Sequence, residues 1–220
     1  MPKVLVTGAS YGIGKAVAEL FLGSGREFFV CGFDKEDPTI CHERYQHYQG
    51  YINGYNKLPH VEGVNILINN AGTQAEEEDN INVNLRGLMQ CTEEYGLQPS
   101  IQAIVNIAST SAHNGAEFPE YVASKGGVLA YTKWTAQQVA KYGATCNSIS
   151  PGGVNTGMNA HILNDDKLHE MVLKETLLNK WASAREIAEW VYFVSVVNKS
   201  MTGQDIIIDN GELSKFNFVW

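Results

Sequence analysis

A glycine-rich segment that directly follows a short apolar run constrains the fold more than any other feature of this chain. The run Val4–Val6 is short and continuous, which is typical of a strand covered on both faces. It leads into the sequence TGASYGIG at residues 7–14, and a stretch with helical spacing follows at once. Glycine allows close backbone approach, and a helix N-terminus attracts anions. The order predicts a site for a nucleotide pyrophosphate, although a glycine turn without a ligand remains the alternative at this point.

Apolar runs and helical stretches alternate along the rest of the chain. Further strands are expected at 28–30, 66–68, 103–107, 144–150 and 205–208, with a weaker one near 45–51. Helical spacing marks residues 13–21, 119–142 and 184–197. Such alternation implies crossover connections and a parallel sheet. At 220 residues, we expect one domain of the α/β class, a Rossmann-type doubly wound parallel sheet of about seven strands with helices on both faces.

Composition narrows the classes of partner. The formal net charge is −8, which gives no electrostatic reason to approach nucleic acid or an anionic membrane. No apolar stretch of about 20 residues occurs and no secretory signal is recognisable, so we expect no membrane contact. The four cysteines form no metal-ligand spacing, which favours free thiols in a reducing cytoplasm and no metal site.

Seven ordered motifs give the chain a recognisable signature. The segment TGASYGIG resembles the glycine turn of the short-chain dehydrogenase/reductase family, TGxxxGxG. Four more motifs agree with that family in order, namely NNAG at 69–72, VNLRG around Asn84, VNIAS ending at Ser109 and YVASK at 121–125. PGGVNT at 151–156 and TGQDIIIDNG at 202–211 also match. The resemblance covers essentially the whole chain.

A phenol and an amine stand four residues apart in the motif YVASK. On a helix, Tyr121 and Lys125 share one face. A phenol can accept a proton from an alcohol only if its pKa falls from about 10 towards neutrality, and a nearby ammonium favours phenolate. The resemblance implies that Tyr121 is the general acid/base and that Lys125 also binds the nicotinamide ribose. It further implies that Ser109 binds the substrate oxygen and that Asn84 holds a water of a proton relay.

The resemblance also implies a set of dinucleotide-binding residues. The turn is expected to bind the pyrophosphate, Asn70–Gly72 to lie against the adenosine ribose, and residues 151–156 to present groups to the carboxamide. Residues 159–178 are expected to form a flap over the substrate, with Met158, His161, Ile162 and Leu163 as lining candidates. The complete expected cofactor set is Gly8, Ser10, Tyr11, Gly12, Ile13, Gly14, Asp34, Asn70, Ala71, Gly72, Tyr121, Lys125, Pro151, Gly152, Val154 and Thr156.

Asp34 decides which dinucleotide we expect. A carboxylate after the second strand binds both ribose hydroxyls and repels a 2′-phosphate. A count in register from the glycine turn places Gly32 at the family's acidic position, so Asp34 reaches it only if the strand is about two residues longer than usual. Tyr11 stands where NADP-using members often carry a basic residue. We therefore expect NAD, with NADP not excluded. An acidic run at 76–79 marks a connection that is shorter than in most members.

The resemblance implies an oxidoreductase that transfers a hydride between nicotinamide and the CH–OH or C=O group of a small alcohol or ketone. Candidate substrates are of the 3-oxoacyl, polyol or dihydrodiol type. The alternative is a catalytically silent NAD(P)-binding regulator on the same fold, which would not need all four of Asn84, Ser109, Tyr121 and Lys125. By analogy with the family we also expect a homo-oligomer, either a dimer or a tetramer.

Overall fold

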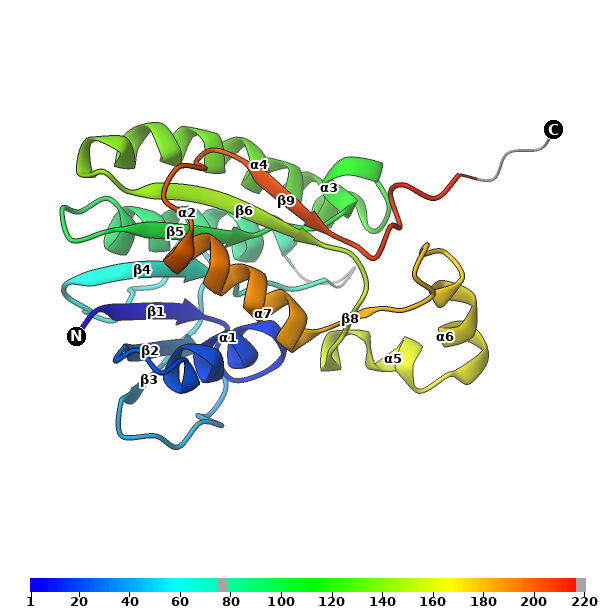
Figure 1. The fold of residues 1–220 in the computed structure, drawn as a ribbon, viewed down its shortest axis with the longest axis horizontal. Helices are drawn as coiled ribbons and strands as arrows, with labels where there is room; N and C mark the ends of the chain where they lie inside the picture. The colour runs from blue at the N-terminus through cyan, green and yellow to red at the C-terminus, as the bar shows by residue number, and fades with distance from the viewer. Residues whose placement is uncertain (75–78, 217–220) are drawn as a thin grey trace.

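A seven-stranded parallel sheet forms the centre of the computed structural model, which describes residues 1–74 and 79–216 (Figure 1). The strand order is β3-β2-β1-β4-β5-β6-β9, and every neighbouring pair is parallel. The chain adds β2 and β3 on one side of β1 and then places β4 on its other side. The direction in which strands are added therefore reverses at β1. The strands are β1 Lys3–Thr7, β2 Phe29–Asp34, β3 Tyr45–Gln49, β4 Val64–Asn69, β5 Ala103–Ile107, β6 Thr145–Pro151 and β9 Asp205–Ile208.

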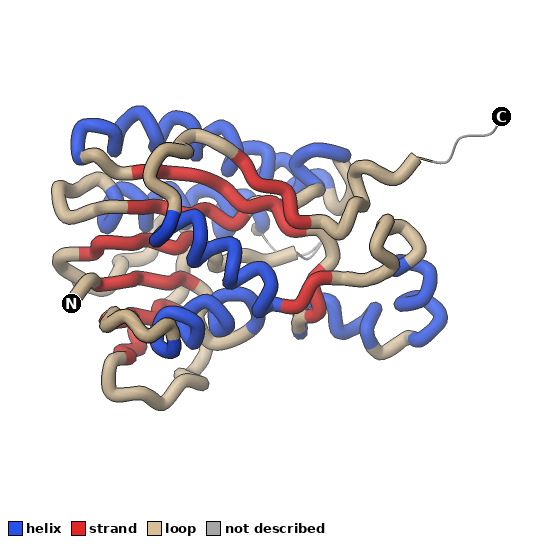
Figure 2. The backbone as a smooth tube through the Cα atoms, in the orientation of Figure 1, coloured by secondary structure: helices blue, strands red, loops and turns tan. Residues whose placement is uncertain are grey.

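Helices cover both faces of this sheet (Figure 2). Because side chains alternate along a strand, Val4 and Val6 pack under α1 and α7, whereas Leu5 packs on the opposite face with α4 and the segment before β5. Val4, Leu5 and Val6 are completely buried in these two apolar layers. The longer helices are α1 Gly12–Gly23, α4 Pro119–Val139 and α7 Ala184–Tyr192, and the chain before β5 is built from η1 Ile81–Gly87, α2 Leu88–Cys91 and η2 Thr92–Gly96.

The predicted fold class is confirmed, and so are the strands proposed from apolar runs. The weak third strand lies at 45–49, within the expected range. The second strand starts one residue later than expected and continues to Asp34. Residues 35–44 contain no helix, so β2 and β3 are joined by a loop rather than by a helical crossover. Of the acidic run at 76–79, residues 76–78 lie outside the described residues.

The segment between β6 and α7 extends beyond the carboxyl ends of the strands (Figure 1). It contains the short strands β7 Val154–Asn155 and β8 Ala182–Ser183, which pair with each other. Between them lie the helical segments η4 Gly157–Asn159, α5 Ala160–Leu163 and α6 Asp166–Leu173, none of which has a buried residue. The remaining helical segments are α3 Ser111–Asn114, η3 Ala140–Tyr142 and η5 Phe193–Val197. Among the described helices, none has the length and apolar character needed to span a membrane.

Candidate active site

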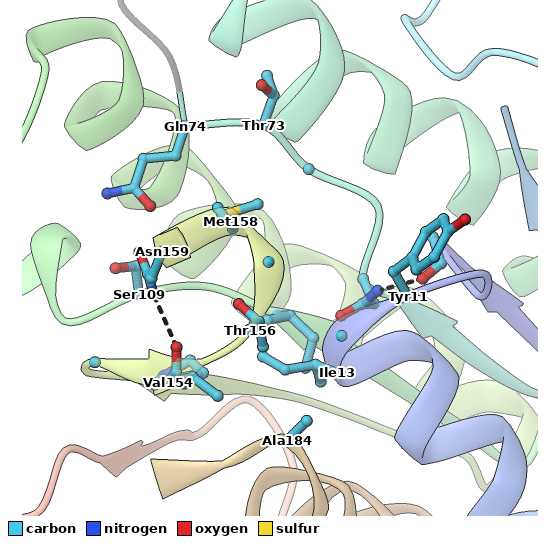
Figure 3. Close-up of a pocket in the computed structure, with 18 of the residues that line it drawn as sticks. Tyr11, Ile13, Thr73, Gln74, Ser109, Val154, Thr156, Met158, Asn159 and Ala184 are labelled. Carbon is cyan, nitrogen blue, oxygen red and sulfur yellow. Dashed lines mark hydrogen bonds between the residues drawn. The ribbon is translucent and has the colours of Figure 1, made fainter. Parts of the chain in front are cut away.

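A single open cleft lies at the carboxyl ends of the strands and brings most of the predicted site residues together (Figure 3). Its volume is about 1540 Å³, above the roughly 300–1,000 Å³ typical of small-ligand pockets. Ser10, Gly14 and Asn84, expected in the site, lie behind its wall. The expected residues that line the cleft are Gly8, Tyr11, Gly12, Ile13, Asp34, Asn70, Ala71, Gly72, Ser109, Tyr121, Lys125, Pro151, Gly152, Val154 and Thr156.

The three motif glycines have different roles in the turn. Gly8 and Gly12 have φ values of +68° and +55°, which favour glycine. A Cβ on Gly14 would lie 2.0 Å from the Gly8 carbonyl oxygen, and one on Gly8 would lie 2.8 Å from Asn70 Nδ2. At Gly12 the nearest atom would be the Thr156 methyl at 3.4 Å. Gly8 and Gly14 therefore clear space for neighbouring protein atoms, whereas a Cβ on Gly12 would meet only an ordinary van der Waals contact.

The turn still fits an anionic group. It opens α1, a helix of 12 residues, and the N–H groups of a first helical turn lack intrahelical partners. The first turn of α1 contains no acidic side chain to compensate the positive end of the helix dipole. Gly12 leaves the backbone open towards the cleft. Backbone donors and a helix N-terminus thus meet the requirements of a pyrophosphate.

Asn70 and Thr7 tie the end of β4 to the end of β1. The Asn70 side-chain amide donates to the carbonyl oxygens of Thr7 at 3.0 Å and Gly8 at 3.1 Å. In return, the backbone N–H groups of Asn70 and Ala71 donate to Thr7 Oγ1 at 2.9 and 3.0 Å. The turn at residues 70–72 thus has a structural role besides the expected contact with the ribose, and Thr7 is its partner. The sequence contained the signal, because Thr7 opens the glycine motif.

Asp34 reaches the glycine turn because β2 extends to residue 34. Its carboxylate accepts hydrogen bonds from the Ser10 N–H at 2.8 Å and from the Glu36 N–H at 3.1 Å. The long-strand alternative of the sequence argument is therefore the one observed. A side chain at Gly32 would collide with the Tyr45 hydroxyl, whose oxygen lies 2.0 Å from the ideal Cβ position. Tyr45 fills the space that the family's acidic residue would need, and Asp34 is the carboxylate that lines the cleft.

Tyr121, Lys125 and Ser109 meet at the end of β5. Lys125 Nζ lies 5.7 Å from the centroid of the Tyr121 ring and donates a hydrogen bond to the Ile107 carbonyl oxygen at 2.9 Å. Ser109 Oγ donates to Ser111 Oγ and accepts from the Ser111 N–H, both at 3.1 Å. All three predicted side chains are less than 9 % exposed and still line the cleft. Ser111, which does not match the motif, holds the Ser109 hydroxyl in place.

Burial controls the protonation of this group in the ligand-free protein. Burial raises the pKa of Tyr121, the hydrogen bond with Ser109 lowers it, and the charge of Glu117 raises it. Burial also lowers the pKa of Lys125 to about 8. Lys125 is not among the groups that shift the pKa of Tyr121 in the ligand-free protein, where its ammonium donates to the Ile107 carbonyl oxygen. Tyr121 therefore holds its proton at neutral pH.

Asn84 lies in the π-helical segment η1, behind the lysine. Its Oδ1 accepts from the Thr73 N–H at 2.7 Å, and its Nδ2 donates to the Thr73 carbonyl oxygen at 2.9 Å and to Ser124 Oγ at 3.1 Å. Ser124 Oγ in turn donates to the Tyr121 carbonyl oxygen at 2.7 Å. The side chain of Asn84 thus fixes the loop at residue 73 to α4, the helix that bears Tyr121 and Lys125.

The segment after β6 forms a further part of the cleft wall, with Val154, Thr156 and Met158 (Figure 3). Asn159 Nδ2 donates to the Val154 carbonyl oxygen at 2.8 Å, which closes the turn around Thr156. Of the four flap residues proposed as lining candidates, Met158, His161 and Ile162 line the cleft. Sequence reasoning missed Trp181 and Glu212, which also line it. Neither belongs to a motif, and each reaches the site from a distant part of the chain.

Comparisons with known proteins match this chain to reductases and dehydrogenases. A family profile described as Enoyl-(Acyl carrier protein) reductase matches residues 59–212. The 3-oxoacyl-(acyl-carrier-protein) reductase of Chlamydia pneumoniae is 30% identical over 95% of this chain and 96% of its own. The 2-dehydro-3-deoxy-D-gluconate 5-dehydrogenase of Bacillus subtilis is 29% identical over 96% and 94%. The structure of 4-hydroxyisoleucine dehydrogenase complexed with NADH superimposes with a TM-score of 0.86 at 26% identity, covering 98% of this chain and 100% of that one.

Fold and site together define an oxidoreductase of the dinucleotide-binding α/β class. The chain belongs to the short-chain dehydrogenase/reductase family. It is an NAD(P)-dependent oxidoreductase that acts on CH–OH or C=O groups. The resemblance drawn from the motifs is thereby confirmed.

Proposed function

We propose that this protein reduces a small ketone, and oxidises the corresponding alcohol, with Tyr121 transferring the proton. The observation that carries the proposal is the buried group at the end of β5, where Tyr121, Ser109 and a fully buried Lys125 line one cleft with the glycine turn. A nicotinamide dinucleotide supplies or accepts the hydride when bound. The protein's own contribution is to orient the substrate oxygen and to move one proton.

Each side chain has a defined part in that transfer. The Tyr121 hydroxyl, protonated at neutral pH because burial raises its pKa, donates its proton to the oxygen of a ketone. Ser109 Oγ, held by Ser111, donates a hydrogen bond to the same oxygen as negative charge develops there. The ammonium of Lys125 stabilises the phenolate that remains and is placed to bind ribose hydroxyls. Asn84 keeps α4 aligned with the 72–74 loop.

The cofactor in this proposal is NAD rather than NADP. The carboxylate of Asp34, fixed by two backbone N–H groups, lies where an adenosine ribose would meet the end of β2. Each of the two nearby lysines forms an ion pair with a glutamate. The Nζ–Oε1 distance is 3.9 Å for Lys15 and Glu19 and 4.0 Å for Lys35 and Glu36. Together with Asp34 these groups leave a net negative charge at the end of β2, which disfavours a 2′-phosphate.

Substitution of the phenol tests the proposal directly. Tyr121→Phe removes the proton donor and keeps the ring, so turnover of NADH with cyclohexanone or dihydroxyacetone should fall roughly 10²- to 10⁴-fold. Binding of NADH, followed by nicotinamide fluorescence, should change less than about threefold. Tyr131→Phe, a hydroxyl deletion on the same helix but outside the cleft, serves as the control. Undiminished turnover in Tyr121→Phe would remove the proposed proton path, and an unreactive wild-type protein that binds NADH would favour the silent regulator.

The wider setting is also a proposal. We infer that residues 1–220 form one dinucleotide-binding domain, that the chain self-associates as a dimer or tetramer, and that it works in the cytoplasm. On the outer side of α4, Trp134 is 43 % exposed, and its ring centroid lies 5.2 Å from that of Tyr131 in a stacked arrangement. An exposed aromatic pair of this kind supports a contact between two copies of the chain. All four cysteines are free and three of them are buried, which suits a reducing compartment. Light scattering against a subunit mass of 24.2 kDa measures the assembly.

A further inference from the structure

Glu212 brings a carboxylate to the cleft from the far end of the chain. It follows β9 and lines the same cleft as Ser109 and Tyr121. Its Oε1 accepts from Thr110 Oγ1 and from Asn114 Nδ2, each at 3.4 Å. Its Oε2 would lie 2.7 Å from a Cβ built on Gly152, so the glycine at that position leaves room for the carboxylate. Two segments that flank the reaction centre, the one after Ser109 and the one after β6, therefore converge on Glu212.

The described residues do not fill the hydrogen-bonding capacity of this carboxylate. A carboxylate offers about four acceptor positions, and well-formed O–H···O bonds are about 2.7–2.8 Å long. The two side-chain bonds of Glu212 are long at 3.4 Å, and the backbone of Gly153 supplies one further bond. Glu212 is half-buried rather than solvated. A ligand in the cleft can therefore offer Glu212 stronger donors than the described side chains do.

Charge in this part of the cleft is negative. Glu117 and Glu175 line the cleft together with Glu212. Burial raises the pKa of Glu212 most, and the charge of Asp209 raises it further. Among the described residues that line this part of the cleft, the basic side chains are Lys125, whose ammonium bonds Ile107, and His161 on the flap. The other described cations of the cleft, Lys15, Lys35 and Arg185, belong to α1, to the loop after β2 and to the start of α7.

An aromatic ring completes this part of the wall. Trp181 lies against Gly153 so closely that a Cβ there would come within 2.2 Å of two ring atoms. The ring lines the cleft beside Val172, while Asn114 contributes an amide next to Glu212. A broad apolar ring, an amide and a partly unfilled carboxylate suit a ligand that has both C–H surface and several hydroxyl groups.

We propose that Glu212 determines substrate specificity by accepting hydrogen bonds from hydroxyl groups next to the reacting carbon, so that the enzyme selects a neutral polyhydroxylated substrate over an anionic one. The inference rests on the proposed function for the reaction itself. It assigns to Glu212 the selection of the substrate, not the transfer of the proton or hydride. An anionic group at the same place would meet the charges of Glu212 and Glu175. Among the described residues of the loops after β5 and β6, no lysine or arginine lines the cleft.

Three ring alcohols that differ in one substituent test this selection. The probes are cyclohexanol, trans-cyclohexane-1,2-diol and cis-2-hydroxycyclohexanecarboxylate, each oxidised with NAD. The wild-type protein should give a kcat/KM for the diol roughly tenfold to a hundredfold above those of the other two, the range expected for a hydrogen bond to a charged acceptor. Glu212→Gln should reduce the diol-to-cyclohexanol ratio to within about threefold through KM, and should improve the carboxylate probe. Glu43→Gln, an exposed carboxylate far along the chain, controls for the change in net charge.

Binding measured without turnover separates this inference from the proposed reaction. Each probe is titrated into the complex with NADH, and its Kd is read from nicotinamide fluorescence. Diol binding that depends on Glu212 supports the inference even if no probe is oxidised, in which case the proposed function alone fails. Equal binding of the diol and the carboxylate, or a diol preference that survives Glu212→Gln, would overturn the role of Glu212 and leave the proposed reaction untouched.

Discussion

The two sides of the cleft are built in different ways. Around the glycine turn, Asn70, Thr7 and Asp34 fix the backbone with hydrogen bonds of 2.8–3.1 Å. Across the cleft, the helical segments at 157–173 contain no buried residue. Segments with few buried contacts open at low free-energy cost. The side that contains the glycine turn is therefore held by its own hydrogen bonds, whereas the side that contains residues 157–173 has few buried contacts to hold it.

Gly14→Ala should disrupt the packing of the glycine turn and cause the largest loss of stability among these substitutions. Its Cβ would lie 2.0 Å from the Gly8 carbonyl oxygen and 2.5 Å from Asn70 Nδ2, and neither backbone nor a twice-bonded amide can give way cheaply. We expect a loss of about 3 kcal/mol or more in unfolding free energy and loss of NADH binding. Gly23→Ala, at the end of the same helix with no atom within 4 Å of its Cβ, is the control and should stabilise slightly. Equal behaviour of the two variants in urea unfolding would contradict the tight packing.

Lys125→Met should make the protein more stable and inactive. Burial lowers the pKa of Lys125 from 10.5 to about 8. Between these values the unfolded chain binds more protons than the folded one, so the contribution of this residue to stability increases as pH rises from about 8 to 10.5. At pH 7 the charged lysine therefore costs stability, and methionine should add up to about 3 kcal/mol.

The gain from Lys125→Met should shrink as the pH approaches 10.5, which urea unfolding at pH 7 and pH 10 measures for both proteins. Lys133→Met, exposed on the same helix, should show no such dependence. A methionine variant that is less stable at pH 7 would show instead that the bond to the Ile107 carbonyl outweighs the cost of burying the charge.

Asp34→Asn tests the part of the cleft at the end of β2, where we propose that the adenosine ribose binds. Asparagine keeps an oxygen for the Ser10 N–H and removes the charge, so the turn should stay intact. We expect NADPH to bind about tenfold more tightly relative to NADH, a change of about 1.4 kcal/mol. Fluorescence titration with both dinucleotides measures it, with the exposed Asp37→Asn as the charge control. An unchanged ratio would place the ribose away from Asp34.

Gly157→Ala, on the flap side, should have the smallest effect on stability. A Cβ on Gly157 meets no atom within 4 Å, and its backbone is outside the left-handed region. Unfolding free energy should change by less than about 0.5 kcal/mol, while the KM for substrate responds if the flap closes on binding. Thermal unfolding and steady-state kinetics measure the two quantities. A stability loss similar to that of Gly14→Ala would mean that the flap is as rigid as the turn.

The sequence alone determined the topology and most of the reaction group. Strands, crossover helices and the glycine turn follow from local periodicity, and Tyr121 and Lys125 are neighbours because four residues make about one helical turn. Asp34 was decided only in three dimensions, because the length of β2 and the Tyr45 side chain from β3 set which carboxylate reaches the turn.

Tertiary structure also decided the charge state of the site and its outer wall. The pKa values of Tyr121 and Lys125 depend on burial by residues distant in sequence. Glu212 and Trp181 enter the cleft from segments that carry no motif of their own, one after the last strand and one after the flap. Local sequence encodes elements through short-range periodicity and turn chemistry, whereas burial and the meeting of distant side chains are fixed only when the whole chain packs.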